Sequence, residues 1–269
     1  MSELTLAGRT AVVTGVGRTR GIGFAIARRL LIMGASVCCQ HWSPHDADQP
    51  WGAEPFDQVR AALAEHRQGE AQLVDVSTDL AEPDAAETMI NSAVGELGHL
   101  DVLVCNHARS GGDGPLAEQT VDTLDGDWQV NARATLLATR AFAAQHDGRD
   151  GGRVIWMTSG QVAGPMSQEI AYVASKAALA GVTSSVADDL VTRGILLNTV
   201  NPGPVNTGYL DPETTDRPDQ LDDIRARFPL RRFGEPDDPA RLIAWLVSDE
   251  GRWVVGQVIS SEGGFRRWG

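Results

Sequence analysis

The sequence predicts a single α/β domain built on a doubly wound parallel sheet of about seven strands, with helices on both faces. Short apolar runs alternate with longer helical patterns along the chain. The first apolar run is followed by a glycine-rich turn that opens a helix. No internal repeat and no linker rich in Pro, Gly or Ser divides the 269 residues. We therefore expect residues 1–269 to form one domain.

Each expected strand is an apolar run, and each expected helix carries the period of an amphipathic helix. The expected strands are residues 9–14, 35–41, 71–76, 101–105, 153–158, 195–200 and 257–261. The expected helices are residues 21–33, 56–67, 82–97, 125–146, 168–191 and 239–248. Two long polar segments interrupt the alternation, residues 43–55 and 207–235. Long loops in compact domains are commonly functional.

Composition excludes several classes of protein. A net charge of −13 argues against nucleic acid and against an anionic membrane surface as partners. The N-terminus lacks the pattern of a signal peptide, and no stretch suggests a membrane span, so we expect a cytoplasmic protein. Three cysteines without framework spacing indicate free thiols. Two of them, Cys38 and Cys39, are adjacent on an expected strand and should point to opposite faces of the sheet.

The only lysine, Lys176, lies four residues after Tyr172, one of two tyrosines. The other 22 basic residues (23 minus this lysine) are arginine. An ammonium one helical turn from a phenol should stabilise the phenolate and lower the phenol pKa toward working pH. Such a phenol is a usable general acid or base. Arginine keeps the charge but not the compact donor geometry, which explains why lysine persists here.

The turn at residues 14–23 contains four glycines, Gly15, Gly17, Gly21 and Gly23, and opens the helix expected from Gly21. Glycines let the backbone approach a pyrophosphate, which then lies at the helix N-terminus. An ordinary strand-to-helix turn is the competing explanation. The position of the glycine-rich turn at the first strand–helix junction favours the binding of a dinucleotide cofactor.

Together these residues resemble the short-chain dehydrogenase/reductase family in its classical Tyr-x-x-x-Lys form, from Gly8 to about Gly264. The resemblance implies a Rossmann fold, an NAD(P)-dependent oxidoreductase acting on CH–OH or C=O groups, and a homo-oligomer, dimer or tetramer. The family's active-site serine would be Ser159 and its relay asparagine Asn131. The segment at residues 105–108 looks like a degraded form of the family's Asn-Asn-Ala-Gly turn. Residues 201–207 match the segment that lines the nicotinamide.

The glycine turn departs from the family pattern, because five residues separate Gly15 from Gly21. Enoyl-carrier-protein reductases have a similarly long turn, but they space tyrosine and lysine seven apart. The corresponding position here is Glu169, so we do not expect an enoyl reductase. The nearest general resemblance is to 3-oxoacyl-carrier-protein reductases, although the fold and the active-site residues do not fix the substrate.

Cofactor choice depends on the end of the second strand, where a carboxylate would bind the adenosine ribose diol. His41 stands there, followed by Trp42 and Ser43, and Arg20 precedes Gly21 with Arg18 nearby. These residues favour NADP(H) over NAD(H), because guanidinium suits a phosphate. A solvated arginine in an arginine-rich chain is the competing explanation. The adenine contact is expected at Asp79, with Asp75 as a second candidate.

The expected catalytic residues are Asn131, Ser159, Tyr172 and Lys176. The expected cofactor contacts are Gly15, Gly17, Arg18, Arg20, Gly21, Ile22, Gly23, His41, Trp42, Ser43, Asp79, Leu80, Asn106, His107, Ala108, Tyr172, Lys176, Pro202, Gly203, Val205 and Thr207. No metal is expected, because Pro44 interrupts the pairing of the two histidines at residues 41–46.

The predicted reaction is hydride transfer between NADP(H) and a ketone or secondary alcohol, with a 3-oxoacyl thioester as one candidate substrate. An NAD-dependent alcohol dehydrogenase and a non-catalytic cofactor-sensing module are the alternatives. Residues 207–233 are expected to form a lid over the substrate. Its short amphipathic helix at residues 221–230 would turn Ile224 and Phe228 toward the substrate.

Overall fold

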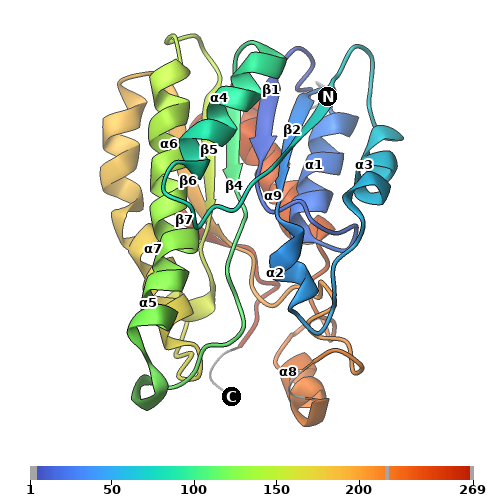
Figure 1. Ribbon diagram of the computed structural model, residues 1–269, viewed down its shortest axis with the longest axis vertical. Helices are drawn as coiled ribbons and strands as arrows, with labels where there is room; N and C mark the ends of the chain where they lie inside the picture. The colour runs from blue at the N-terminus through green and yellow to red at the C-terminus, as the bar shows by residue number, and fades with distance from the viewer. Residues whose placement is uncertain (1–4, 216–217, 267–269) are drawn as a thin grey trace.

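The computed structural model describes residues 5–215 and 218–266. Seven parallel strands form one sheet in the order β3-β2-β1-β4-β5-β6-β7 (Figure 1). The expected fold class is confirmed. The strands are β1 (Thr10–Val13), β2 (Ser36–His41), β3 (Leu73–Ser77), β4 (Val102–Cys105), β5 (Gly152–Met157), β6 (Ile195–Asn201) and β7 (Val258–Ser260).

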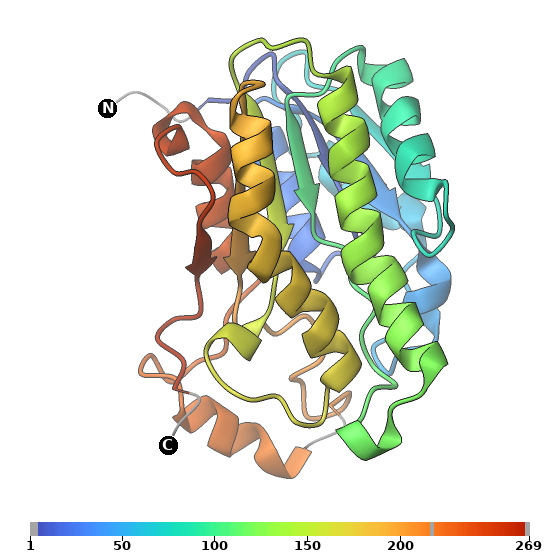
Figure 2. The same ribbon diagram turned by 90° about the vertical axis from the view of Figure 1, so that its left-hand side faces the viewer.

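Helices cover both faces of the sheet. One layer holds α1, α3 and α9, and the other holds α4, α6 and α7 (Figures 1 and 2). The α-helices are α1 (Ile22–Ile32), α2 (Ser43–Ala47), α3 (Phe56–Ala64), α4 (Ala85–Leu97), α5 (Val121–Asp127), α6 (Ala134–Gln145), α7 (Ile170–Val191), α8 (Leu221–Ala226) and α9 (Asp237–Val247). Short helical turns are η1 (Leu116–Glu118), η2 (Trp128–Arg133), η3 (Gly160–Val162), η4 (Pro218–Gln220) and η5 (Asp249–Gly251).

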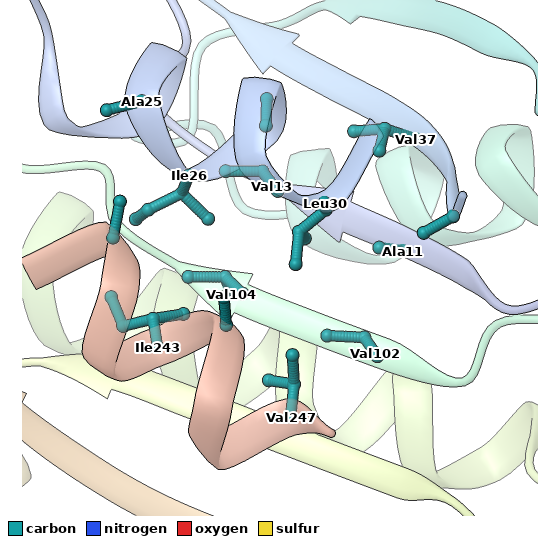
Figure 3. Close-up of a cluster of buried hydrophobic side chains, with 14 of the residues drawn as sticks. Ala11, Val13, Ala25, Ile26, Leu30, Val37, Val102, Val104, Ile243 and Val247 are labelled. Atoms are coloured by element: carbon teal, nitrogen blue, oxygen red, sulfur yellow. The ribbon is translucent and has the colours of Figure 1, made fainter. Parts of the chain in front are cut away.

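Alternate residues of each strand face two separate hydrophobic cores, as the pleat of a strand requires. Val102 and Val104 of β4 face α9, where Ile243 and Val247 pack against them (Figure 3). Leu103, between them, belongs to the opposite core. Cys39 likewise lies in the first core and Cys38 in the second, which confirms that they face opposite sides of the sheet.

The carboxyl ends of all seven strands meet at one edge of the sheet. In an open parallel sheet, ligands bind outside this edge, where neighbouring crossovers lead to opposite faces. Here that point lies between β1 and β4, which are hydrogen-bonded neighbours. The glycine-rich turn follows β1, and the segment that resembles Asn-Asn-Ala-Gly ends β4 and continues past it. The fold therefore brings both expected cofactor-binding segments together.

The expected helix at residues 125–146 is wrong in its continuity. The chain forms α5, one π-helical turn at η2, and then α6. The π turn accommodates one extra residue, which an apolar period read from sequence does not detect. Thr120 begins α5 earlier than expected, through a capping box with Thr123.

The two polar segments are more ordered than their sequence suggests. Residues 43–55 contain α2, and the expected helix at 221–230 ends at Ala226. Phe228 is buried and contacts the rings of Phe233 and Phe265, and its place facing the substrate stays a prediction. Of the expected lid, residues 216–217 lie outside the described residues.

Within the described residues, α7 is long and apolar enough, by length and composition alone, to span a membrane. Length and composition are weak evidence, because core helices pass the same test. This helix packs against β6 and η2 and carries Tyr172 and Lys176. This packing explains the apolar character of its buried face.

Candidate active site

The glycine-rich turn has the form of a phosphate cradle. Gly15 has φ +70°, and a Cβ there would lie 2.9 Å from the Cα of His107. A Cβ at Gly23 would lie 2.3 Å from the carbonyl oxygen of Gly15. Helix α1 begins at Ile22 after Gly21, with no side-chain cap and no acidic residue in its first turn. Close backbone approach and free helical N–H groups suit a pyrophosphate.

Both arginines of this turn are held by side chains or backbone of distant segments. Arg18 donates from Nε to Asp46 Oδ1 at 3.1 Å and from Nη1 to the carbonyl oxygen of Thr207 at 2.8 Å. Arg20, which is 56% exposed, pairs with Asp211 at 2.7 Å. Gly17 lies under Asp46, whose Oδ2 would be 2.5 Å from a Cβ there. Segments 43–55 and 207–211 therefore contact the turn.

The end of β2 presents no carboxylate toward the cofactor side. His41 is buried, stacks on Phe56 at 3.5 Å, and has its Nε2 3.4 Å from Asp75. Burial lowers the pKa of His41, although Asp75 opposes this shift. Asp75 lies within β3 and also faces Arg60. Its carboxylate therefore contacts side chains of the protein, His41 and Arg60.

The remaining expected cofactor contacts follow the strand ends. Trp42 is the N-cap of α2 and Ser43 its first residue. Asp79 follows β3 and accepts a hydrogen bond from the backbone N–H of Ala81, beside the buried Leu80. The contacts after β6 are Pro202, Gly203 at φ +68°, Val205, which bridges to Gly234, and Thr207.

The turn after β4 is tied to β1. Asn106 donates from Nδ2 to the carbonyl oxygens of Thr14 and Gly15. The buried His107 connects Thr14 Oγ1, at 2.6 Å from Nδ1, with the carbonyl oxygen of Val130, at 3.0 Å from Nε2. Burial and the Lys176 charge lower the pKa of His107 to about 3. A neutral imidazole therefore links Thr14, the residue after β1, to the π turn at η2. Ala108, the next expected cofactor contact, follows His107 in the loop.

The π turn presents Asn131, which is fully buried. Its Oδ1 accepts from the backbone N–H of Arg109 at 2.7 Å. Its Nδ2 donates to Asp127 Oδ1 at 3.1 Å and to Ser175 Oγ at 3.0 Å, and it lies 3.2 Å from the carbonyl oxygen of Arg109. Asn131 thus joins α5, the β4–α5 loop and α7. Its contact on α7 is Ser175, the residue before Lys176.

Tyr172, Lys176 and Ser159 come together where β5 ends and α7 begins. Lys176 is buried; its Nζ donates to the carbonyl oxygen of Met157 at 3.1 Å and lies 5.8 Å from the centroid of the Tyr172 ring. The Ser159 side chain hydrogen-bonds to Tyr172. The proton-transfer group, its hydrogen-bonding hydroxyl and the ammonium are therefore adjacent.

The expected lowering of the phenol pKa is wrong for the protein alone. Burial raises the pKa of Tyr172 to about 12, outweighing the bond from Ser159, and Glu169 and Asp127 raise it further. Burial also lowers the pKa of Lys176 to about 8. Removing a charged group from water outweighs a favourable neighbour at this site.

One residue that holds the start of α7 escaped the sequence analysis, Asp113. Asp113 accepts from the backbone N–H groups of Tyr172, at 2.8 Å, and Ala171, at 3.3 Å. It therefore caps α7 from a loop 59 residues away from Tyr172 in sequence. No local signal identifies such a cap, because the usual pattern places the capping residue just before its helix.

Asp113→Ala should lower the free energy of unfolding by about 0.5–2 kcal/mol at neutral pH, as loss of a helix cap does. Burial alone would raise the pKa of Asp113, but hydrogen bonds from Tyr172, Gly114, Gln119 and Ala171 lower it. The stabilisation is therefore complete above the ordinary pKa of 3.8 and is lost as pH falls through the lower folded value.

Denaturant unfolding of wild type and Asp113→Ala at several pH values tests this cap. The exposed Asp122, in the first turn of α5, supplies the control variant Asp122→Ala. A cost for Asp113→Ala that stays constant down to acidic pH would contradict the role of the ionised carboxylate.

Known proteins share this architecture. A family model described as enoyl-(acyl carrier protein) reductase matches residues 15–266. The oxidoreductase YjdA of Bacillus subtilis is 34% identical over 261 residues, covering 96% of this chain and 97% of that protein. The crystal structure of a metagenomic blue fluorescent protein in complex with NADPH has a TM-score of 0.81 and 34% identity, covering 97% and 99% of the two chains.

A short-chain dehydrogenase from Burkholderia cenocepacia, solved in complex with NADP, has a TM-score of 0.81 and 32% identity, covering 96% of this chain and 98% of its own. These matches extend over nearly the whole chain and include the glycine-rich turn, the π turn and α7. The chain therefore belongs to the short-chain dehydrogenase/reductase family of NAD(P)-dependent oxidoreductases.

Proposed function

We propose that this protein transfers hydride between NADP(H) and a ketone or secondary alcohol. One observation carries the proposal: the Tyr172 phenol is hydrogen-bonded by Ser159, with the Lys176 ammonium one helical turn away. A proton donor, an oxyanion-stabilising hydroxyl and a buried cation then share one site. Such a group of residues suits reduction of a carbonyl.

In the direction of reduction, the bound nicotinamide supplies the hydride that reaches the carbonyl carbon. Tyr172 gives its phenolic proton to the carbonyl oxygen, so that an alcohol forms. The raised pKa keeps the phenol protonated at neutral pH, which suits a proton donor. Ser159 donates a hydrogen bond to the same oxygen, where negative charge develops.

Lys176 and Asn131 help to replace the proton that Tyr172 gives to the substrate. The ammonium would hold the nicotinamide ribose when the cofactor is bound, and it would stabilise the developing phenolate. With a pKa of about 8, Lys176 can also exchange a proton near neutral pH. Asn131 supports a water that connects Lys176 to solvent. This role agrees with its burial and with its hydrogen bond to Ser175, next to the lysine.

NADP(H) is favoured over NAD(H) because the end of β2 carries His41 in place of a carboxylate, and Arg18 and Arg20 flank the glycine-rich turn. Two similar structures were solved with NADPH and NADP. The cradle at Gly15 and Gly23, with the uncapped start of α1, fits the pyrophosphate. The alternative cofactor is NAD(H) in an alcohol dehydrogenase.

A 3-oxoacyl thioester on a carrier protein is the substrate suggested by resemblance. A cofactor-sensing module is disfavoured, because such a protein has no use for Ser159, Tyr172 and Lys176 in contact. We also propose a homo-oligomer, a dimer or a homotetramer. Helix α7 leaves much of its apolar surface exposed, including Val182 and Val191, and the edge strand β7 exposes Val258.

Tyr172→Phe should reduce turnover roughly 10²–10⁴-fold, because the proton donor is lost, while cofactor binding changes little. Lys176→Arg should also be severely impaired, because arginine keeps the charge without the compact contact. A screen of ketones and alcohols with both cofactors, followed by nicotinamide absorbance, supplies the assay. Turnover of Lys176→Arg within a few-fold of wild type would show that the site does not need lysine.

Arg20→Ala should weaken NADPH binding by roughly 1–3 kcal/mol and change NADH binding little, if Arg20 binds the 2′-phosphate. The ion pair with Asp211 provides a matched control. Asp211→Asn releases Arg20 and should leave NADPH binding unchanged or tighter. Calorimetric titration with both cofactors measures these effects. Equal losses for NADPH and NADH in Arg20→Ala would indicate a structural role.

Residues 207–233 are proposed to close over the substrate. Arg18 and Arg20 hold Thr207 and Asp211, while Phe228 is anchored by Phe265. Among the described residues, the moving part should therefore lie at 212–215 and 218–227. Hydrogen exchange with and without NADP(H) and substrate should show added protection there on binding. Full protection in the free protein, unchanged on binding, would exclude a lid.

A further inference from the structure

Beside the site lies a charged pair that the mechanism above does not use. Asp127, the last residue of α5, is 3% exposed. Its Oδ1 accepts from Asn131 Nδ2 at 3.1 Å, and its Oδ2 lies 3.8 Å from Nε of Arg109. Arg109 follows β4, and its side chain is 44% exposed. Burying an ionised carboxylate costs free energy unless it is paired with an opposite charge and hydrogen-bonded.

Asp127 fixes the orientation of the Asn131 side-chain amide. An ionised carboxylate accepts hydrogen bonds but donates none. Asp127 therefore requires the amide nitrogen of Asn131 to face it, which leaves Oδ1 toward the N–H of Arg109 at 2.7 Å. Because the same nitrogen bonds Ser175 Oγ, Asp127 also fixes how η2 meets α7.

The buried carboxylate of Asp127 also affects the charge of Lys176. Its Nζ bonds a neutral carbonyl, that of Met157, so its counter-charge must lie further away. Burial raises the pKa of Cys105 to about 12, and burial and the Lys176 charge lower that of His107 to about 3, so both are neutral at pH 7. Tyr172 is also neutral there, with its pKa near 12. The carboxylate of Asp127 acts on Lys176 and favours the ammonium.

Arg109 determines whether that carboxylate stays ionised. Burial raises the pKa of Asp127 to about 6; Arg109, Asn131 and Lys176 oppose the rise, and Asp113 adds to it. Asp127 is therefore mostly ionised at neutral pH and becomes neutral in mild acid. The groups that act on it come from the β4–α5 loop, η2 and α7.

We propose that Asp127 is a positioning residue of the hydride-transfer site, which orients the Asn131 amide and supplies the buried negative charge that balances Lys176. Arg109 keeps Asp127 in its ionised form. This inference rests on the proposed function for its catalytic meaning. The electrostatic relation between Asp127 and Lys176 belongs to the protein alone.

The direction of the effect follows from the charges. Loss of the Asp127 charge removes a stabiliser of the ammonium, so the pKa of Lys176 falls below about 8. The same loss lowers the pKa of Tyr172, which Asp127 raises. Both groups would then release protons at lower pH.

Because Lys176 is the only lysine, a lysine side-chain isotope label gives one NMR signal that reports this residue alone. Its titration requires neither cofactor nor substrate. In Asp127→Asn we expect the midpoint to fall by about one pH unit or more. The control is Asp125→Asn, which removes the same charge from an exposed position of α5 and should leave the midpoint unchanged.

Arg109→Gln keeps the experiment decisive if Asp127→Asn does not fold. Its side chain is partly exposed, so the fold should tolerate the change. Protonation of Asp127 should perturb the Lys176 signal in mild acid, and this perturbation should move to higher pH in Arg109→Gln. A Lys176 titration that is the same in wild type, Asp127→Asn and Arg109→Gln would overturn the proposal.

The pH dependence of carbonyl reduction completes the test. In Asp127→Asn the alkaline loss of kcat/KM should shift to lower pH, because Tyr172 and Lys176 lose their protons earlier. A shifted lysine titration with no reductase activity in wild type would refute the proposed function and leave the charge relation standing. An unshifted lysine titration with normal reduction would refute only the role of Asp127.

Discussion

The burial of one ammonium group, that of Lys176, constrains the rest of the site. The residue is 2% exposed, and its Nζ donates a hydrogen bond to a neutral carbonyl of β5, that of Met157. An unbalanced charge in such a place is expensive, so the neighbouring groups must not add to it. Burial and the Lys176 charge keep His107 neutral, and burial keeps Cys105 a neutral thiol that supplies no counter-charge. The carboxylate that remains, Asp127, balances the charge from the adjoining helix.

The hydrogen bonds around this charge connect elements that are distant in sequence. His107 joins β1 to the π turn, Asn131 joins the π turn to α7, and Asp113 caps α7 from the β4–α5 loop. These bonds are part-buried or buried, so breaking one leaves an unsatisfied group. The reacting residues therefore lie on a rigid part of the molecule, as accurate positioning requires.

The glycine-rich turn contacts its covering segments through the side chains of Arg18 and Arg20. Arg20 and Asp211 form a partly exposed ion pair, and Arg18 reaches the backbone of Thr207. Exposed ion pairs contribute little to stability, typically about 0–1 kcal/mol. The Arg20–Asp211 pair therefore contributes little to the hold on residue 211. The pair of Arg18 with Asp46 is largely buried, so residues 43–55 are held more firmly against the glycine-rich turn.

Much of this protein could be predicted from the sequence. The parallel sheet follows from alternating apolar runs and helical periods, and Tyr172 with Lys176 follows from their spacing on one helical face. The glycine turn is also local, because its backbone conformation is encoded by the residues that adopt it. These features depend on neighbours within a turn or two, which is the range over which sequence patterns act.

Tertiary structure decided the features that depend on distant neighbours. The sign of the Tyr172 shift is one, because burial outweighs a nearby cation, and burial is a property of the folded protein. The π turn at Asn131, the cap that Asp113 supplies to α7 and the approach of Asp127 to Lys176 are others. Each depends on segments brought together at the carboxyl edge of the sheet, and no local pattern records which distant residue will fill that space.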